Sequence, residues 1–597
     1  MRKPHFLPAN KSCELPANAL WFDTETTPVL NTEREEVHHL NFGWAAFRRR
    51  RDALHWCQPE WLRFDTREDF WDWVIAHCRD RCRLYLFAHN GQFDLPVMAA
   101  FTELPNRGFK LTNAIVECPP MVLTWKRGSQ TIRFIDTLNL WRVPLEKIGE
   151  HVGLPKLTMP EPAASREDWD AYGKRDTEII MEACLNWWRF IRDNDLGGFA
   201  PTLAGQAFTA YRHRFMPVKI FCDDKPKALE LARQAYLGGR VECFRLGEYE
   251  GRFYHLDVNS MYPSVMAAET YPVSLVGVYS RGTPEQLREW LDRYRIIADV
   301  SITTRTPCYP QVLGGRLCFP TGRLRVQLSS PELEYALAQG HLEQIHAMAI
   351  YKAARPFEEF VEFFYAERLA AAARGDDASK WFIRILLNSL YGKFGQRGRR
   401  YETEEVDVDP DIKTWTEINA QTLKIARYRQ FGGLRQHWVE EGEARHSHPA
   451  IAAHVTAYAR CKLWSIIQRA GRGNVYYCDT DCVVVNQAGH ERLTPLLHET
   501  KLGALKLEAA YSRLKLDGPK DYRFDDKQVT KGVRRNARWQ DEATVQQDQF
   551  VGFKGLLKRG SLEAPIVRQQ VKHLDRTYTK GRVQPDGRVL PLRSSDR

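Results

Sequence analysis

Residues 255–264 read HLDVNSMYPS, a stretch in which an apolar run passes through a carboxylate and enters a turn. The run 253–258 predicts a β-strand that ends at Asp257. A second apolar run, 474–485, carries Asp479 and Asp481 where a β-hairpin would turn. Carboxylates from separate segments can bridge two Mg²⁺ ions, which activate a 3′-hydroxyl and neutralise a triphosphate. The two segments therefore predict a two-metal site carried by strands.

Helices are expected between these segments. The region 357–390 reads as two helical stretches separated by Gly-Asp-Asp at 375–377. Four side chains on the second stretch recur at spacings of four, four and three, which places them on one helical face: Lys380, Arg384, Asn388 and Tyr391. Two cations and an amide suit a triphosphate, and a tyrosine suits stacking on a base pair. By itself, however, this stripe is equally expected for an amphipathic helix whose basic side faces solvent and binds nothing.

Another set of carboxylates stands in the N-terminal third. Asp23 and Glu25 follow a short apolar run that reads as a strand, and Asp94 follows a second such run. Tyr172 and Asp176 are four residues apart, so a helix would place them on one face. Four carboxylates at the ends of strands and helices could hold two hard cations through oxygen ligands. Such a pair of ions suits phosphodiester hydrolysis, and the tyrosine hydroxyl could orient the attacking water.

These motifs resemble those of a known family. DTET, HNGQFD and YGKRD are similar to the three exonuclease motifs of proofreading family B DNA polymerases. HLDVNSMYPS, RILLNSLYGKFG and YYCDTDC are similar to polymerase motifs A, B and C, in that order. The resemblance runs unbroken from residue 20 to residue 522. It implies an α/β multidomain fold, in which an RNase H-like exonuclease domain precedes a right-hand polymerase with palm, fingers, thumb and insertions.

The resemblance also implies an activity. That activity is DNA-directed DNA polymerisation with 3′–5′ proofreading, using template–primer DNA and dNTPs. Two Mg²⁺ ions per active site would serve as cofactors, and Mn²⁺ could substitute for them. Tyr262 would stack under the incoming sugar and exclude a 2′-hydroxyl, which argues for deoxynucleotides.

Site residues follow from the resemblance, motif by motif. The expected polymerase metal ligands are Asp257, Val258 through its carbonyl, Asp479 and Asp481. The expected exonuclease residues are the ligands Asp23, Glu25, Asp94 and Asp176, Tyr172 for the water, and Lys156 as the site lysine. The expected nucleotide contacts are Val258, Tyr262, Lys380, Arg384, Asn388 and Tyr391. The expected contacts with the frayed 3′ strand are Asn90, Phe93, Asp136, Thr137 and Leu138.

Three further elements are expected to touch template and primer. They resemble the YxGG, Tx2AR and KxY elements of the family, and their residues are Tyr236, Gly238, Gly239, Arg240, Thr456, Arg460, Lys520 and Tyr522. Two positions depart from the family pattern. Arg384 stands where lysine is usual, and arginine stays protonated, so donating a proton to pyrophosphate would fall to Lys380 or water. Cys482 stands where serine is usual and is a weaker hydrogen-bond donor.

The YxGG and Tx2AR elements in a chain of 597 residues resemble the protein-primed branch found in phages and linear plasmids. That branch implies two insertions that wrap DNA and allow strand displacement, the first of which binds a priming terminal protein. The expected domains are an exonuclease domain (1–198), a first palm segment (199–280), an insertion candidate with palm (281–355), fingers (356–396), a second insertion candidate (397–449), a second palm segment (450–515), and the KxY element with a basic thumb (516–597).

Composition sets broader bounds. Lys and Arg number 86 against 75 Asp and Glu, a net charge of +11 that points weakly to polyanions. Residues 551–597 carry much of the excess, which predicts either a phosphate-binding strip or a solvated basic tail. The sequence contains no uninterrupted apolar stretch of about 18 residues, and its first residues lack the apolar core of a signal peptide. With 13 cysteines and no paired zinc pattern, we expect reduced thiols. We expect a monomer that makes no membrane contact and lies in the cytoplasm, that of a bacterial host if the protein is viral.

Alternative functions stay open at this stage. The chain could be a family B polymerase that uses ordinary nucleic-acid primers, or a nuclease whose polymerase half only binds DNA. A replication scaffold and an RNA polymerase or primase are further alternatives. Two complete carboxylate sets argue against a scaffold, and Tyr262 argues against ribonucleotide use.

Overall fold

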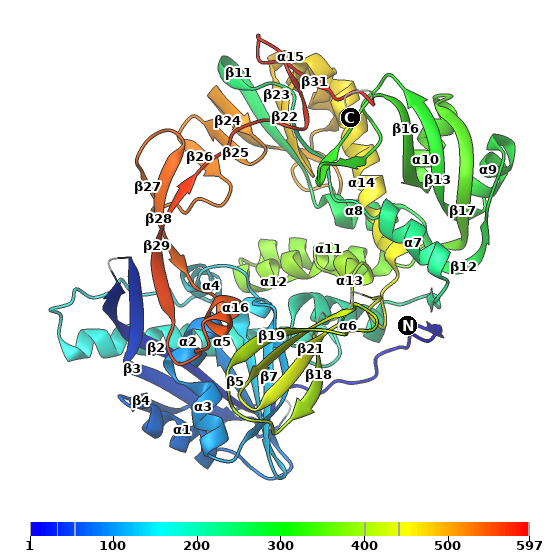
Figure 1. The fold of residues 1–597 in the computed structure, drawn as a ribbon. Coiled ribbons are helices and arrows are strands. Elements are labelled where there is room, and N and C mark those ends of the chain that lie inside the picture. The colour runs from blue at the N-terminus through cyan, green and yellow to red at the C-terminus, as the bar shows by residue number, and fades with distance from the viewer. Residues whose placement is uncertain (1, 33, 53–54, 399–400, 440–441, 595–597) are drawn as a thin grey trace.

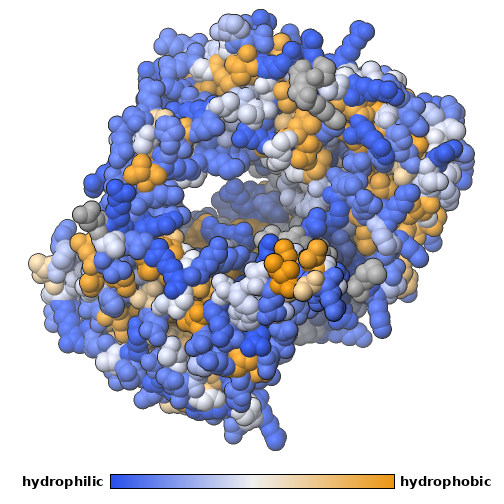
Figure 2. All heavy atoms as spheres, in the orientation of Figure 1, coloured by the Kyte–Doolittle hydropathy of each residue, from blue (hydrophilic) through white to orange (hydrophobic). Residues whose placement is uncertain are grey.

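The computed structural model describes residues 2–32, 34–52, 55–398, 401–439 and 442–594. The described chain forms a ring, with the N-terminal sheet on one side and a second large sheet on the other (Figure 1). The space-filling view shows an opening through the molecule with mostly hydrophilic residues around it (Figure 2). No helix of the described residues is long and apolar enough to cross a membrane.

The N-terminal sheet is built around two parallel strand pairs, β2 with β5 and β5 with β8. These strands cover Asn18–Thr32 (β2), Arg83–Ala88 (β5) and Gln130–Asp136 (β8). Because the carboxyl ends of parallel strands meet at one edge, the residues that follow β5 lie near the middle of β2. The long helix α5 (Arg166–Asp193) packs against this sheet through a wide buried face. The strands and the helix predicted for this third are present, but the first strand does not end before Asp23 as predicted: β2 continues through Asp23 and Glu25 to Thr32.

The second sheet carries the C-terminal carboxylates. Its strand order is β10-β22-β23-β11-β24-β25-β26. The central strands are β11 (Gly247–Val258), β22 (Val475–Asp479) and β23 (Cys482–Asn486), and the edge strand β10 covers Val241–Cys243. The strands β22 and β23 form the predicted hairpin. Helix α14 (Pro449–Ala470) packs on one face of this sheet through Leu463, Trp464 and Ile467.

The two helical stretches predicted over 357–390 are α11 (Glu358–Ala373) and α12 (Asp377–Leu387), followed by the short α13 (Leu390–Phe394). The second expected insertion contains a separate antiparallel sheet, and the first supplies three strands of another sheet, whose remaining strand precedes residue 281. The sheet joined by the first insertion has the order β12-β17-β13-β16, with bounds Tyr271–Tyr279, Leu342–Ala354, Tyr294–Thr304 and Gly322–Ser329. The sheet of the second insertion has the order β18-β21-β20-β19, with bounds Tyr401–Val406, Leu434–Trp438, Ile425–Phe431 and Lys413–Ile418.

The C-terminal segment joins both large sheets. Strand β24 (Leu505–Gly518) extends the second sheet along β11, followed by β25 (Asp521–Phe524) and β26 (Lys527–Thr530). The next strands join the N-terminal sheet instead: β27 (Arg538–Trp539), β28 (Thr544–Phe550) and β29 (Ile566–His573), where β29 pairs with the edge strand β3 (Glu35–Arg49). A later bridge between Arg588 and Arg245 returns the chain to the second sheet. The basic segment is therefore divided between the two halves of the ring, because its strands satisfy exposed sheet edges.

Candidate active sites

The first site gathers carboxylates from β2 and α5. Asp23 and Glu25 are two residues apart on β2, so they point to the same face of the sheet. Asp176 comes from α5, which packs over that face. Carboxylate oxygens of Asp23, Glu25 and Asp176 all lie within 4.8 Å of one another. The tertiary structure therefore brings together three of the four carboxylates that the sequence assigned to one metal site.

The remaining carboxylate of this set lies next to the other three. Asp94 is buried in α2 (Gly91–Val97) and accepts a hydrogen bond of 2.8 Å from the Thr24 hydroxyl, which belongs to the same strand segment as Asp23. Burial, and then the Asp23 charge, raise the pKa of Asp94. Asn90, the residue before α2, has a left-handed backbone with φ of 77°, which turns the chain sharply from β5 into the helix.

Lys156 and Tyr172 complete the first site. The Lys156 ammonium forms an ion pair with Asp176. The same ammonium lies 4.3 Å from the centroid of the Tyr172 ring. Tyr172 precedes Asp176 by one helical turn and is buried. The interpretation of Lys156 as a site lysine, which rested on resemblance, thus has a geometric basis.

Burial and mutual repulsion make these carboxylates hold protons tightly. Burial raises the pKa of Asp23 to about 6, although the Lys156 charge opposes the change. Burial and the Asp23 charge raise the pKa of Glu25 to about 8. A buried oxygen of Asp176, Oδ1, has no hydrogen-bond partner among the described residues. A cluster of carboxylates with an unpaired buried oxygen fits divalent cations bound through oxygen, which would replace the protons.

The residues expected to touch a frayed strand divide into two groups. Asn90, Phe93 and Leu138 are partly exposed near the site. Asp136 and Thr137 are buried. The Asp136 carboxylate accepts hydrogen bonds from the backbone N–H groups of Asn90 (3.0 Å), Gly91 (3.1 Å) and Leu138 (2.9 Å). The prediction of direct strand contact is corrected for these two residues, because their polar atoms already hold the turn between β5 and α2.

The second site lies where β11 meets the hairpin of β22 and β23. Asp257 pairs with Cys482 across these strands, and the Val258 N–H donates to the Asp481 carbonyl at 2.8 Å. Thr480, at the tip, has a φ of 61°. Burial, and then the Asp481 charge, raise the pKa of Asp257 to about 7. Its Oδ1 is buried and has no partner in the described chain, so this set also fits a divalent cation.

Asp479 is engaged within the protein. Its Oδ2 lies 2.9 Å from the Lys520 ammonium and accepts a hydrogen bond of 3.1 Å from the Tyr477 hydroxyl. Lys520 precedes β25, where Tyr522 stacks on Phe524 at 4.2 Å between ring centroids. The KxY element therefore packs directly against the hairpin that carries the carboxylates.

The predicted stripe on the fingers is confirmed as an exposed face. Lys380, Arg384 and Asn388 are exposed, whereas Trp381, Phe382, Ile383, Leu386 and Leu387 are buried beneath them. The Arg384 charge lowers the pKa of both Asp257 and Asp481 against the larger effect of burial, so the guanidinium faces the second site. Tyr391 follows the helix, and its ring centroid lies 4.5 Å from that of Tyr262, which belongs to α8 (Met261–Ala268).

One cation at this site was missed when only the sequence was considered. Arg368 lies on α11, and its guanidinium donates to the Ser260 hydroxyl at 3.1 Å, directly before α8. Burial lowers the pKa of Arg368, Tyr365 opposes this change, and the Arg384 charge adds to it. Arg368 and Arg384 are each eight residues from Asp376, at the turn between the two helices. A helical hairpin places such positions side by side, and this spacing could have identified Arg368.

The prediction that Arg240 and Arg460 touch template or primer DNA is corrected, because both side chains are buried. Arg240 is 1% exposed and forms an ion pair of 2.6 Å with Glu242. Arg460 is 3% exposed, pairs with Glu332 at 2.8 Å, and donates to the Leu237 carbonyl at 2.7 Å. Arg460 thus holds the backbone of the YxGG loop, and Arg240 anchors the end of that loop to β10 through Glu242.

Thr456 is corrected in the same way, because it is 2% exposed and its hydroxyl donates to backbone carbonyls of its own helix. The two glycines of the YxGG element differ. Gly238 has open space around it, whereas a Cβ on Gly239 would lie 2.7 Å from the Thr480 side chain. Gly239 therefore allows the loop to approach the hairpin that carries Asp479 and Asp481.

Comparison with known proteins agrees with this architecture. Residues 198–430 match the family model described as DNA polymerase type B, organellar and viral. The DNA-directed DNA polymerase of Enterobacteria phage PRD1 is 26% identical over 456 residues, which cover 73% of this chain and 72% of that protein. A probable DNA polymerase of Neurospora intermedia is 24% identical over 370 residues, and the match covers 59% of this chain but only 37% of that longer protein.

Among solved structures, phi29 DNA polymerase with primer–template DNA and incoming nucleotide substrates aligns with a TM-score of 0.67. It is 17% identical, and the alignment covers 94% of this chain and 100% of that one. The chain that carries the two carboxylate sets is therefore similar in sequence to a phage DNA polymerase and similar in fold to phi29 DNA polymerase. Residues 198–430 thus resemble the organellar and viral type B DNA polymerases, and the chain has the fold of phi29 DNA polymerase.

Proposed function

We propose that this protein is a DNA-directed DNA polymerase with a 3′–5′ proofreading exonuclease. The observation that carries the proposal is the presence of two separate carboxylate sets on this fold, one on β2 and α5 and one on β11 and the β22–β23 hairpin. Within the described chain, each set contains a buried carboxylate oxygen without a hydrogen-bond partner, as a cation ligand would. A nuclease alone would need only the first set.

In the proposed synthesis site, Asp257, Asp481 and the Val258 carbonyl would hold Mg²⁺, or Mn²⁺ in its place. Bound there, the ions would lower the pKa of the primer 3′-hydroxyl and neutralise the triphosphate. Lys380, Arg384 and Asn388 would bind the dNTP phosphates from the exposed face of α12. The tyrosine pair of Tyr262 and Tyr391 would lie beneath the sugar and base, where the packed rings leave little room for a 2′-hydroxyl.

In the proposed exonuclease site, Asp23, Glu25, Asp94 and Asp176 would hold the cations. Tyr172 would orient the water for attack on the terminal phosphodiester. The Lys156 ammonium, which contacts Asp176 and lies over the Tyr172 ring, would fix that tyrosine and offset the carboxylate charge. Asn90, Phe93 and Leu138 would hold the 3′ end.

DNA binding is supported by the ring and by its charge. The opening in Figure 2 has mostly hydrophilic residues around it, and the basic C-terminal segment spans both halves of the ring. We assign the domains as the sequence predicted them, with residues 538–573 as the portion of the last domain that joins the exonuclease sheet. A polymerase that encloses its template in this way can act as a monomer.

Protein priming and strand displacement are the finer elements of the proposal. Strands β13, β16 and β17 lie in the first insertion and form a sheet with the preceding strand β12, and we assign to this sheet the docking of a terminal protein. Phage PRD1 and Bacillus phage Nf supply relatives that match over most of their own length, which supports a viral genome as template and a bacterial cytoplasm as compartment.

A single gel tests both activities. A 5′-labelled primer on a longer template is incubated with Mg²⁺, with and without dNTPs. Lengthening with dNTPs and shortening without them is the expected result. Shortening alone would favour the nuclease-only alternative and would indicate that the departures at Arg384 and Cys482 impair synthesis. Extension of an ordinary DNA primer by itself would not establish protein priming, which requires nucleotide transfer to a protein hydroxyl.

The second insertion offers a separate test of strand displacement. The β19–β20 hairpin carries three exposed apolar side chains at its tip: Ile418 (65% exposed), Leu423 (77%) and Ile425 (55%). Replacing residues 417–426 by Asn-Gly keeps the lower portion of the hairpin, because that dipeptide suits a two-residue turn. We expect loss of synthesis through duplex and unchanged synthesis on single-stranded template. Equal loss on both templates would contradict the assignment.

A further inference from the structure

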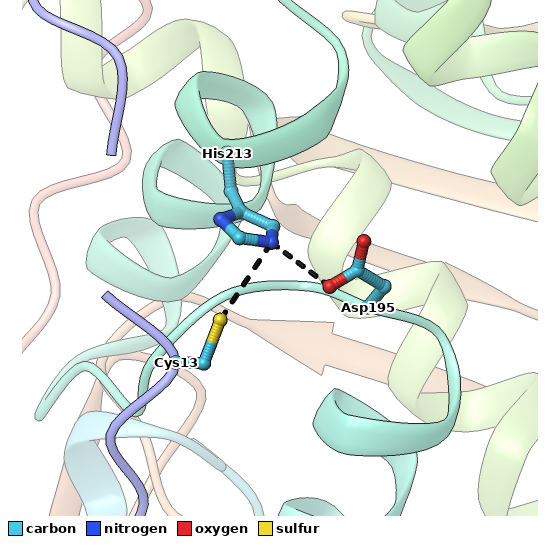
Figure 3. Close-up of side chains that lie close together, drawn as sticks. All are labelled: Cys13, Asp195 and His213. Atoms are coloured by element: carbon cyan, nitrogen blue, oxygen red, sulfur yellow. Dashed lines mark hydrogen bonds and ion pairs between the residues drawn. The ribbon is translucent and has the colours of Figure 1, made fainter. Parts of the chain in front are cut away.

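A cysteine, a histidine and an aspartate meet at the junction between the two halves of the chain, outside both carboxylate sites (Figure 3). Cys13 lies in the N-terminal segment that precedes β2. Asp195 lies in the loop after α5, and His213 lies in the last turn of α6 (Leu203–Arg214). Their ligand atoms lie within 4.8 Å of one another.

Both partners of the histidine face the same ring nitrogen. His213 Nε2 lies 2.9 Å from Asp195 Oδ1 and 4.0 Å from Cys13 Sγ. The other ring nitrogen, Nδ1, lies 2.8 Å from the Asn10 carbonyl. A carbonyl can only accept, so Nδ1 carries the hydrogen. Burial opposes protonation of this ring, but the hydrogen bond to Asp195 raises the pKa of His213, so a metal ion competes with a proton at Nε2. Once Nε2 is deprotonated, its lone pair, the Asp195 carboxylate and the Cys13 sulfur converge on one point.

This arrangement differs from a nucleophilic Cys-His-Asp triad. In such a triad the nucleophile and the carboxylate contact opposite nitrogens of the ring. Here they share one nitrogen, and the other donates to a backbone carbonyl, which is the usual partner of a metal-bound histidine. A cation between the three acceptors would remove their mutual repulsion.

The surrounding backbone holds the three residues in place. The N-terminal segment is fixed to α6 by the Arg212 guanidinium, which donates to the Pro8 carbonyl at 2.7 Å, and by the Asn10 N–H, which donates to the Arg212 carbonyl at 3.0 Å. The loop of Asp195 passes close to the imidazole, because a Cβ on Gly197 would lie 3.1 Å from His213 Cγ. Two of the three side chains, those of Cys13 and Asp195, remain exposed.

We propose that Cys13, Asp195 and His213 bind a Zn²⁺ ion that fastens the N-terminal segment to the junction between α5 and α6. A thiolate, an imidazole and a carboxylate form a donor set that suits zinc, whereas Mg²⁺ prefers oxygen alone. Tetrahedral zinc with bonds of about 2.3 Å to sulfur and about 2.0 Å to nitrogen places those atoms about 3.5 Å apart, so the thiolate need move only slightly. Water would fill the fourth position on the exposed side.

Cobalt tests the site in the full-length protein, since Co²⁺ occupies zinc sites and reveals a sulfur ligand by a thiolate-to-metal charge-transfer band. The carboxylate sites would also bind Co²⁺, and the second has Cys482 beside Asp257, so every protein in this experiment carries Cys482→Ser to keep that sulfur from contributing to the band. We expect the band in the Cys482→Ser protein, its loss when Cys13→Ser is added, and its retention when Cys82→Ser, which changes another exposed cysteine, is added instead. Zn²⁺ should displace Co²⁺ and remove the band, whereas excess Mg²⁺ should not.

Affinity separates a metal site from a simple ion pair. Asp195→Asn should weaken Zn²⁺ binding by at least about 10-fold, as losses around metal ligands do, whereas Asp193→Asn should have no effect. The site would be refuted by the absence of a charge-transfer band in the Cys482→Ser protein, or by its persistence when Cys13→Ser is added. In that event His213 and Asp195 form a hydrogen-bonded ion pair, with a proton in place of the metal.

Discussion

The two carboxylate sites differ in how a nearby cation offsets the repulsion between their negative charges. In the proposed exonuclease site, Asp23, Glu25 and Asp176 are already gathered within 4.8 Å, and a nearby cation, Lys156, contacts Asp176. In the proposed polymerase site, Asp257 and Asp481 are joined through the backbone, because Val258 donates to the Asp481 carbonyl, and the cation whose charge acts on them, Arg384, comes from α12. The first site is thus assembled by one rigid sheet and one helix, whereas the second depends on how two domains approach each other.

This difference predicts which activity tolerates domain motion. The ligands of the first site should be less sensitive to a motion of α12, because β2 and α5 pack directly on each other. Helix α5 also contacts α12, where the ring centroids of Trp187 and Phe382 lie 4.8 Å apart. The second site would gain or lose a neighbouring charge if α12 moved. A nucleotide that draws α12 inward would complete the charge balance only when it is bound.

The largest expected effect comes from separating the two ligand sets. Asp481→Ala should lower primer extension by at least about 10³-fold, since a lost metal ligand removes several kcal/mol of transition-state stabilisation. Degradation should stay unchanged. Asp23→Ala combined with Asp94→Ala should give the opposite result. Both rates are measured on the same labelled primer, and circular dichroism verifies folding. Loss of both activities in a folded variant would break the two-site comparison.

The next effect concerns the cation from the fingers. Arg384→Ala should raise the KM for dNTPs by about 10- to 100-fold, the equivalent of one charge-assisted hydrogen bond. Arg384→Lys should recover most of the loss, because lysine keeps the charge. Steady-state extension measures both. Arg374→Ala, at the exposed end of α11, is the matched control. Equal defects in Arg374→Ala would show that the effect is general to the fingers surface.

The cation within the exonuclease site should change the pH profile. Lys156 lowers the pKa of Asp23 and Glu25 against the larger effect of burial, and both carboxylates bind metal only when deprotonated. Glu25, with a pKa of about 8 before metal binds, should make degradation at limiting Mg²⁺ rise with pH. Lys156→Met should move this rise to higher pH and lower activity by about 10-fold near neutrality. Initial rates across pH measure the shift.

Lys174→Met is the control for that experiment, since Lys174 is exposed on the same helix and lies 4.9 Å from the Trp61 ring centroid. Its profile should match the unmodified protein. An unchanged pH profile in Lys156→Met would show that Lys156 does not offset the carboxylate charge at the first site, and the proposed difference between the two sites would be lost. Polymerisation by Lys156→Met should be normal in either case.

The smallest expected effect concerns the basic segment that spans both halves. Deleting residues 551–597 would be a poor test, because Phe553, Leu556 and Leu557 are buried in the core of the exonuclease sheet. Replacing exposed Lys558 and partly exposed Lys572 by glutamine keeps that core. The slope of log affinity against log salt should fall by up to about 0.9 for each phosphate that is no longer neutralised. An unchanged slope would place the DNA-binding surface on other cations.

Much of the fold could be predicted because local patterns carried it. The hairpin around Asp479 and Asp481 followed from two apolar runs and a polar turn, and the fingers stripe from its spacing. Arg240 and Arg460 show where local patterns fail. A sequence motif identifies a residue, but its exposure depends on the residues that pack against it. Here both arginines are buried in ion pairs, Arg240 with Glu242 and Arg460 with Glu332. Arg368 was missed for the corresponding reason, since its hydrogen-bond partner Ser260 lies 108 residues earlier in the chain.

The sequence by itself determined that Asp257 and Asp479 lie at the ends of strands and that Tyr172 and Asp176 share one helical face, because strand alternation and the helical period are visible in neighbouring residues. Only the tertiary structure decided which of them share a site, that β29 completes the edge of the N-terminal sheet, and that Cys13 meets His213 across 200 residues. Those contacts join segments far apart in the chain. They arise because exposed sheet edges, apolar faces and unpaired polar groups must find partners, and no local pattern specifies which partner each will find.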